Sequence, residues 1–174
     1  MAIDETRIRQ QLVRQYLAAL AMLRQAIESC PDTLWLDTKY TNRFWHIAYH
    51  TVFYTHFYVQ ASEEDFHPWE HHQKGSNYLG ARTPAATGEP ASEIMPYTRS
   101  DVLEYWILCR DQVAKRVAQD KLDAESGFSW LPFNRFEVHL YNLRHLAHHT
   151  GQLAIRLRTG ANVGVPWIAK AAAS

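Results

Sequence analysis

The chain has 174 residues, and its 18 basic and 18 acidic side chains give no formal net charge. This length fits one domain, residues 1–174, with a core large enough to be stable without disulfide bonds. Disordered chains contain few apolar residues, so a chain that is 47% hydrophobic is expected to be globular. Binding to a phosphate backbone needs an excess of positive charge, so a neutral chain is expected to have no nucleic-acid partner.

The amino terminus gives no sign of export, because residues 1–5 lack a basic region followed by an apolar run. Farther along, no apolar stretch approaches the ~20 residues of a membrane-spanning helix. Cys30 and Cys109 lie far apart in apolar helical contexts and are expected to be reduced, since disulfide frameworks use more cysteines in shorter chains. We therefore expect a cytoplasmic protein without a membrane partner.

The first two predicted helices differ in pattern. Between residues 8 and 27, apolar residues recur at steps of three and four, which is the spacing of one helical face. This helix should end near Cys30–Pro31, because the residue before a proline is pushed out of the helical region. A second helix is expected over about 42–61, and its aromatic residues lie on several faces, which indicates burial on more than one side.

Residues 62–98 form a long connection, because glycine and proline interrupt any period there, at Pro68, Gly75, Gly80, Pro84, Gly88, Pro90 and Pro96. A connection of this length could cross the bundle from end to end and join two parallel helices. A third helix is expected over about 100–119, with Thr98 or Ser100 as its N-cap. A fourth should run over about 134–159 and stop at Gly160. With no alternating strand pattern, the predicted fold is an all-α four-helix bundle with a long crossover between helices two and three.

The fourth predicted helix carries two stripes on roughly opposite sides. One stripe contains Phe136, Leu140, Leu143, Ala147, Thr150, Ala154 and Leu157, and the other contains Val138, Asn142, His145, His149 and Gln152. One side should face the interior of the bundle, which leaves the other free to meet a partner chain. Because the second helix is also aromatic on several faces, we expect a homodimer.

The ten histidines are unevenly placed. His145 and His149 are four residues apart, so on a helix they can offer two imidazoles to one metal ion. His46 and His50 repeat this spacing among aromatic residues, which supply few hydrogen-bond partners. Imidazoles from the two helices would form a divalent-metal site with an open coordination position, as in catalytic sites. His148 is three residues from His145, so His145 with His148 is an alternative pair.

Two segments resemble motifs of the DinB-like (DinB/YfiT-like) superfamily. Residues 141–153, YNLRHLAHHTGQL, resemble its last-helix signature of a histidine, three residues and then His-x-Gly-Gln. Residues 45–48, WHIA, resemble its second-helix His-hydrophobic-Ala motif. The resemblance covers most of the chain and implies a four-helix bundle, commonly dimeric, with one Zn or Ni ion per chain. It implies His46, His145 and His149 as the metal ligands.

The resemblance also implies chemistry, because in the characterised branches the metal activates a thiol or a water for transfer or hydrolysis. We therefore expect a metal-dependent thiol S-transferase or hydrolase with a small-molecule substrate; a non-catalytic metal- or ligand-binding bundle is the alternative. A carboxylate-bridged di-iron site is disfavoured, because Glu137 and His139 lack the Glu-x-x-His spacing. No catalytic base is evident, since Glu137 lies two turns before His145.

Other polar and aromatic residues have less specific expectations. Asn142 and Gln152 could orient ligands from one turn away, while His50 and His148 are expected to support ligands or to pack. The His67–His72 segment could hold a second metal or be solvated.

A third interpretation makes this connection a lid, with Trp69 and Tyr78 covering the open end of the metal site. Residues 130–133, Trp-Leu-Pro-Phe, could line the same pocket or form a packed corner.

Overall fold

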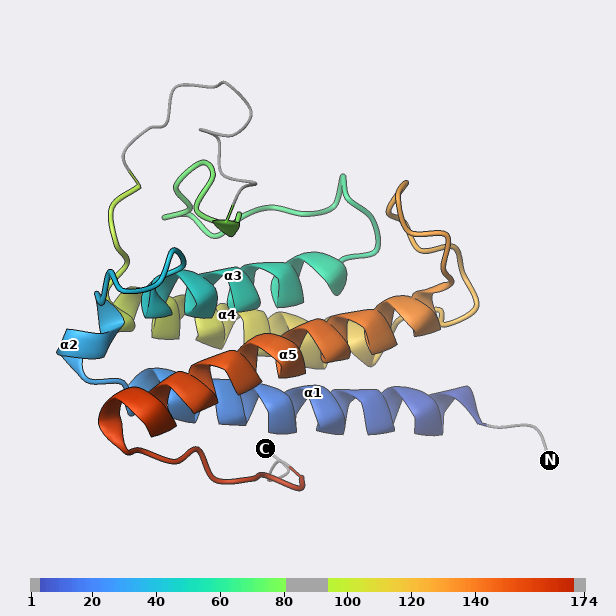
Figure 1. Cartoon of the computed structure of the whole chain (residues 1–174). Helices are drawn as coiled ribbons and strands as arrows, with labels where there is room; N and C mark the ends of the chain where they lie inside the picture. Colours follow the sequence, from blue (N-terminus) through green and yellow to red (C-terminus); the bar gives the residue numbers. More distant parts are fainter. Residues whose placement is uncertain (1–3, 81–93, 171–174) are drawn as a thin grey trace.

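The computed structural model describes residues 4–80 and 94–170, and the regular structure in these ranges is helical (Figure 1). Within them, an isolated bridge between Glu125 and Asn134 is the sole β pairing. The helices are α1 (Glu5–Glu28), α2 (Asp32–Trp35), α3 (Phe44–Tyr58), α4 (Arg99–Val117) and α5 (Arg135–Ala161). The predicted all-α bundle is therefore confirmed, whereas its organisation as one domain stays a prediction.

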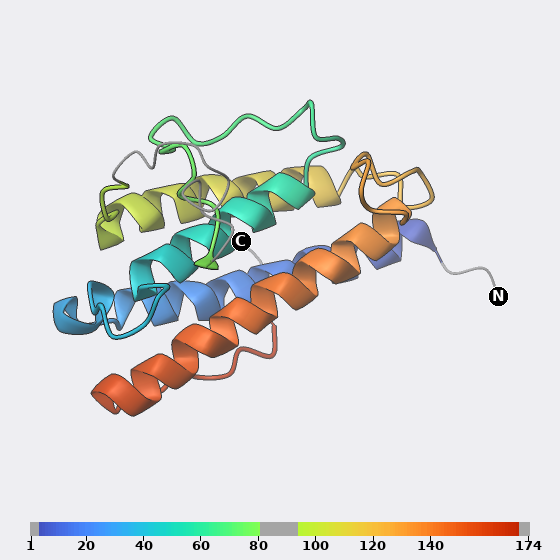
Figure 2. The ribbon, with the colours of Figure 1, turned by 45° about the horizontal axis from the view of Figure 1, so that its top comes forward.

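The four long helices pack in a ring, in which α1 and α3 each contact both α4 and α5. Helices α1 and α5 run in one direction, and α3 and α4 run in the other (Figures 1 and 2). Because α3 and α4 are parallel, the chain after α3 must return along the bundle before α4 begins, as the length of the connection predicted. The predicted breakers Pro84, Gly88 and Pro90 lie outside the described residues.

Local signals explain the helix ends, with one correction. Thr98 caps α4 and forms a capping box with Asp101, in which each side chain accepts a hydrogen bond from the other residue's backbone N–H. Helix α5 does not stop at Gly160; it ends at Ala161 and is capped by Asn162, which adopts a left-handed conformation with φ of 55°. Gly160 stays helical, and a Cβ there would lie 3.2 Å from a methyl group of Leu34. The glycine therefore serves the close approach of α5 to α2.

The short helix α2 was not predicted, because a single turn is too short to show a period. It begins directly after Pro31, and its last residue, Trp35, is buried. The indole N–H of Trp35 donates to the backbone oxygen of Tyr97 at 2.9 Å, just before α4 begins. This contact fixes the start of α4 beside α2.

Burial settles which side of α5 faces the interior. The stripe through Val138, Asn142 and His149 is buried, together with Leu146 and Leu153. Much of the opposite stripe is accessible, and Leu140 is 47% exposed. The interior side of α5 is therefore the one that carries two of the predicted ligands.

A buried ionic cluster holds the start of α5. The Asp120 carboxylate accepts from Arg135 Nε at 2.8 Å and lies 2.9 Å from His139 Nε2. Arg135 also donates to the backbone oxygen of Ser126 at 2.9 Å. The other ring nitrogen of His139 lies 3.3 Å from the Tyr16 hydroxyl on α1. These contacts tie α5 to α1 and to the α4–α5 connection.

The described part of the long connection packs on α3 and α4. The Tyr97 hydroxyl accepts from the backbone N–H of Gln73 at 2.7 Å and donates to the backbone oxygen of His71 at 2.8 Å. His72 Nδ1 lies 2.6 Å from the Tyr49 hydroxyl on α3.

None of the described helices has both the length and the apolar character needed to cross a membrane.

Candidate metal centre

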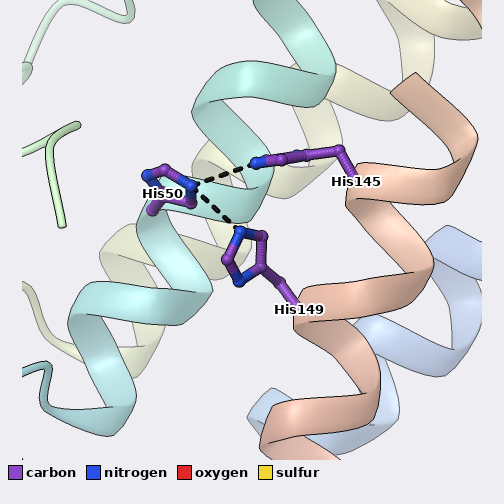
Figure 3. A group of neighbouring side chains, drawn as sticks. All are labelled: His50, His145 and His149. Carbon is purple, nitrogen blue, oxygen red and sulfur yellow. Dashed lines mark hydrogen bonds between the residues drawn. The ribbon is translucent and has the colours of Figure 1, made fainter. Parts of the chain in front are cut away.

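Three histidine side chains converge between α3 and α5 (Figure 3). His50 comes from α3, and His145 and His149 come from successive turns of α5. His50 Nε2 lies 3.0 Å from His145 Nε2 and 3.2 Å from His149 Nε2. The three imidazoles therefore present their Nε2 atoms to one point.

The hydrogen bonds of the other ring nitrogens fix the protonation of two of these rings. His50 Nδ1 lies 2.6 Å from the backbone oxygen of Asn77, and His149 Nδ1 lies 2.8 Å from Oε1 of Gln152. Oxygens of this kind accept hydrogen bonds, so in each ring Nδ1 carries the hydrogen. In a neutral imidazole Nε2 is then a lone pair, ready to bind a metal.

All three rings are held in the neutral form. Burial, with a smaller contribution from nearby histidines, lowers the pKa of His50 to about 3 and that of His145 to about 2, although the hydrogen bond to the Asn77 backbone acts in the opposite direction on His50. Burial also lowers the pKa of His149, although its hydrogen bond to Gln152 acts in the opposite direction. Protonated imidazoles cannot bind a metal ion, so burial keeps the trio competent as ligands near neutral pH.

The arrangement fits a small divalent ion. Imidazole nitrogens bind Zn at about 2.0–2.1 Å, and two such nitrogens in a tetrahedral site lie about 3.3 Å apart. The separations of 3.0 and 3.2 Å from His50 to the other two rings are close to this value. Because the lone pairs of His50 and His149 face each other, they repel unless a cation or a proton lies between them. The trio could thus hold a metal ion.

His46, which the sequence predicts as a ligand together with His145 and His149, is not among the three histidines that converge, and its role as a ligand stays a prediction. It lies one turn before His50 on α3, where its ring stacks on Trp45 at 4.8 Å and is buried. Burial lowers its pKa, and contacts with the backbone of Ser76 and Tyr78 raise it in part. Its Nε2 is buried without a hydrogen-bond partner among the described residues. His46 thus lies against the backbone on either side of Asn77, the residue that orients His50.

Of the other residues expected near the ligands, some contact the converging histidines and some do not. Gln152 contacts a converging histidine, as expected, whereas the Asn142 amide N–H donates to the backbone oxygen of Thr55 at 3.1 Å. His148 is exposed and stands outside the trio, with its ring 4.8 Å from that of His149. The pair that converges on α5 is therefore His145 with His149, and the alternative with His148 is not formed.

A pocket of about 690 Å³ opens in front of the trio. Its described lining includes Tyr78 from the long connection and Trp130 from the α4–α5 connection, as two of the interpretations predicted. Trp69 does not cover it: its ring stacks on Tyr105 at 5.3 Å, and its indole N–H donates to Glu104 at 3.3 Å. The lid interpretation is wrong for Trp69, whose apolar ring is buried against α4.

A second group, Glu70, His71 and Glu104, also brings possible ligand atoms within 4.8 Å of one another. All three side chains are exposed, so water competes for their ligand atoms. Glu70 and His71 lie in the segment for which the sequence left a second metal open, whereas Glu104 lies on α4, and the group is more exposed than the histidine trio.

Comparison with known families agrees with this geometry. The model of the DinB superfamily matches residues 15–153. The chain belongs to the DinB superfamily. Searches of curated proteins and of solved structures found no match. The matched region of this DinB-superfamily protein runs from α1 into α5 and contains all three converging histidines.

Sequence reasoning missed the convergence of His50 with the α5 histidines. His46 and His50 lie on one face of α3, so helical spacing alone does not say which of the two meets the α5 histidines. The choice depends on which turn of α3 lies level with His145 and His149, and the packing of two helices decides this.

We expect replacement of His50, His145 or His149 by alanine to weaken Zn binding by more than about 100-fold, because each change removes a direct ligand. Losing a residue that only hydrogen-bonds a ligand already lowers metal affinity by about 10–100-fold. His46→Ala should weaken it by less than about tenfold, and the exposed His148→Ala is the matched control. Competition with a chromophoric chelator, on protein without a His tag, measures the affinity, and circular dichroism checks that each variant stays helical. Strong loss in His46→Ala with retention in His50→Ala would reverse the assignment.

Proposed function

We propose that this protein is a metal-dependent enzyme, in which His50, His145 and His149 hold one divalent ion, Zn or Ni, beside a substrate pocket. The observation that carries the proposal is the convergence of three neutral imidazoles, shielded from much of the solvent, at the wall of an open pocket. Three imidazoles leave a coordination position for a reacting group, whereas structural Zn sites are closed by four protein ligands. Imidazole nitrogen suits both Zn and Ni.

Such an ion supplies one thing to the reaction, a lowered pKa for a bound thiol or water. The chain's own residues do the rest. The carbonyl oxygen of Asn77 and the amide oxygen of Gln152 fix two imidazoles in the orientation that presents Nε2. Tyr54 packs its ring against both His50 and His145, at 4.7 and 5.6 Å, and so keeps bulk water from one side of the trio.

The absence of a nearby base favours a thiol over water. Among the described residues that line the pocket, Glu63 is the one carboxylate, and it follows the end of α3 rather than adjoining the trio. A thiol loses its proton more readily than water does, so metal-assisted thiol activation needs less help from a base. We therefore place thiol S-transfer ahead of hydrolysis. The same pocket would also serve a non-catalytic ligand-binding protein, which is the alternative.

The Zn- or Ni-loaded protein should accelerate the reaction of 2-mercaptoethanol with a chromogenic electrophile such as 1-chloro-2,4-dinitrobenzene. We expect the rate to fall at least tenfold on chelation and in His50→Ala, and to be unchanged in His148→Ala. Hydrolysis of p-nitrophenyl acetate, followed in parallel, tests activation of water. If the metal binds tightly but neither rate exceeds that of His50→Ala, the ligand-binding alternative replaces the enzyme.

We also propose a homodimer formed through the outer side of α5. Leu140 and Ile155 are exposed on this helix, at 47% and 59%. Beside them, an apolar recess of about 400 Å³ lies between α1 and α5, and its lining includes Ala147, Ala154 and Trp167. Exposed apolar surface of this kind marks a contact with another chain.

Sedimentation velocity at micromolar concentration should give a species near twice the 20.2 kDa chain mass. Ile155→Glu should shift this species towards the monomer, because it would bury a charge at the interface. The control is Ile107→Glu, the same change at a residue of α4 that is 48% exposed and lies away from the outer side of α5. A single species near the monomer mass in the unmodified protein would contradict the proposal.

A further inference from the structure

The pocket in front of the histidines is built along one face of α3. The side chains of this helix that line it are His50, Phe53, Tyr54, Phe57 and Tyr58, which recur at steps of three and four. With a rise of 1.5 Å per residue, the eight steps from His50 to Tyr58 span about 12 Å. The pocket is thus an elongated channel, with the histidine trio near one end and the carboxyl end of α3 at the other.

Aromatic rings form a continuous wall along this channel. The Tyr54 ring stacks with that of Tyr58 at 5.8 Å, and Tyr58 meets Tyr141 of α5 edge to face at 5.2 Å. At the far end, the rings of Phe57 and Trp130 are parallel, with an interplanar angle of 4° and centroids 6.1 Å apart. These faces and edges surround a space large enough for a small molecule.

Large aromatic side chains also remain exposed at the rim. Trp130 is 48% exposed and Tyr78 is 42% exposed, and both line the pocket. A bound molecule would cover apolar ring surface that now faces water, which favours binding.

The charge of the lining selects the kind of molecule. Glu63 is the sole charged side chain among the described residues that line the pocket, and no described lysine or arginine lines it. Arg144 lies over the Tyr141 ring at 5.4 Å but is not part of the lining. Away from the proposed metal ion, an anionic ligand would therefore find no cationic side chain in the described lining, whereas ring faces and a carboxylate both attract positive charge.

We propose that the channel binds a small organic cation, with its ammonium group held by the rings of Phe57, Tyr58 and Trp130 and by the carboxylate of Glu63. The rest of the molecule extends along α3 towards the histidine trio. This inference rests on the proposed function for the identity of the reacting end. It adds that the substrate carries a positive group about 12 Å from that end.

The probe is phenyltrimethylammonium, whose binding to the Zn-loaded protein is measured by calorimetry and by quenching of tryptophan fluorescence. Choline and its uncharged carbon analogue 3,3-dimethyl-1-butanol isolate the contribution of the charge. Benzoate supplies an anion, and it is offered to the chelated protein so that no metal ion can bind its carboxylate. We expect choline to bind about tenfold more tightly than the analogue, phenyltrimethylammonium to bind more tightly still, and benzoate not to bind. Equal affinity for choline and its analogue, tighter binding of benzoate, or no binding of phenyltrimethylammonium would each overturn the proposal.

Variants locate the binding site. Glu63→Gln and Trp130→Leu should each weaken phenyltrimethylammonium binding by about three- to tenfold, while leaving Zn affinity unchanged. Glu64→Gln is the matched control, because Glu64 is exposed, adjacent in sequence and outside the pocket lining. An effect of Glu64→Gln as large as that of Glu63→Gln would show that only the general surface charge matters.

The two proposals can fail separately. Because the cationic group would lie about 12 Å from the trio, chelated protein and His50→Ala should still bind phenyltrimethylammonium. Cation binding without Zn binding would refute the metal centre alone. Tight Zn binding without cation binding would refute the channel proposal alone.

Discussion

The metal centre depends on how far α5 is displaced lengthwise against α3. One helical turn is 5.4 Å, so a slip of one turn would set the α5 histidines level with His46 instead of His50. The half-buried Asp120 carboxylate, which contacts both Arg135 and His139, fixes the start of α5 relative to α1 and to the α4–α5 connection. Arg135 is buried and needs such a partner, because an isolated buried charge costs several kcal/mol. The register follows from this cluster and from the packing of the buried side of α5.

The same packing places the histidines in surroundings that keep them neutral but offer few hydrogen-bond partners. The Tyr54 ring packs against both His50 and His145, and Nδ1 of His145 is buried with no partner among the described residues. An apolar pair in these positions would cost less free energy. The fold retains the imidazoles, and Asn77 and Gln152 turn two of them towards one point. A site so oriented is what a metal-activating enzyme requires.

Much of this arrangement could be predicted from the sequence. Helical spacing located the four long helices and the two stripes of α5, and the proline- and glycine-rich segment predicted the crossover between parallel helices. Which stripe of α5 faces inward was left open by the sequence, and the burial of Val138, Asn142 and His149 decided it. The choice between His46 and His50 could not be made from the chain alone, because both lie on one face of α3 and the register between helices is a property of tertiary packing. Glu63 was missed for the same reason, since it lies beyond the end of α3 and reaches the pocket only through the fold.

The channel and the metal centre share one wall, so each constrains the other. Tyr54 contacts His50 and His145 on one side and Tyr58 on the other, and therefore links the histidines to the aromatic end of the pocket. A substrate that fills the channel would exclude water from the trio while placing its reacting end there. This arrangement explains how a reacting group can be held at the trio without a charged residue beside it.

Anomalous X-ray diffraction from crystals of the Zn-loaded protein, measured above and below the zinc absorption edge, tests the central claim most directly. We predict one strong anomalous peak per chain at about 2.0–2.1 Å from Nε2 of His50, His145 and His149. A peak bonded to His46 in place of His50, or one found solely at Glu70, His71 and Glu104, would contradict the account.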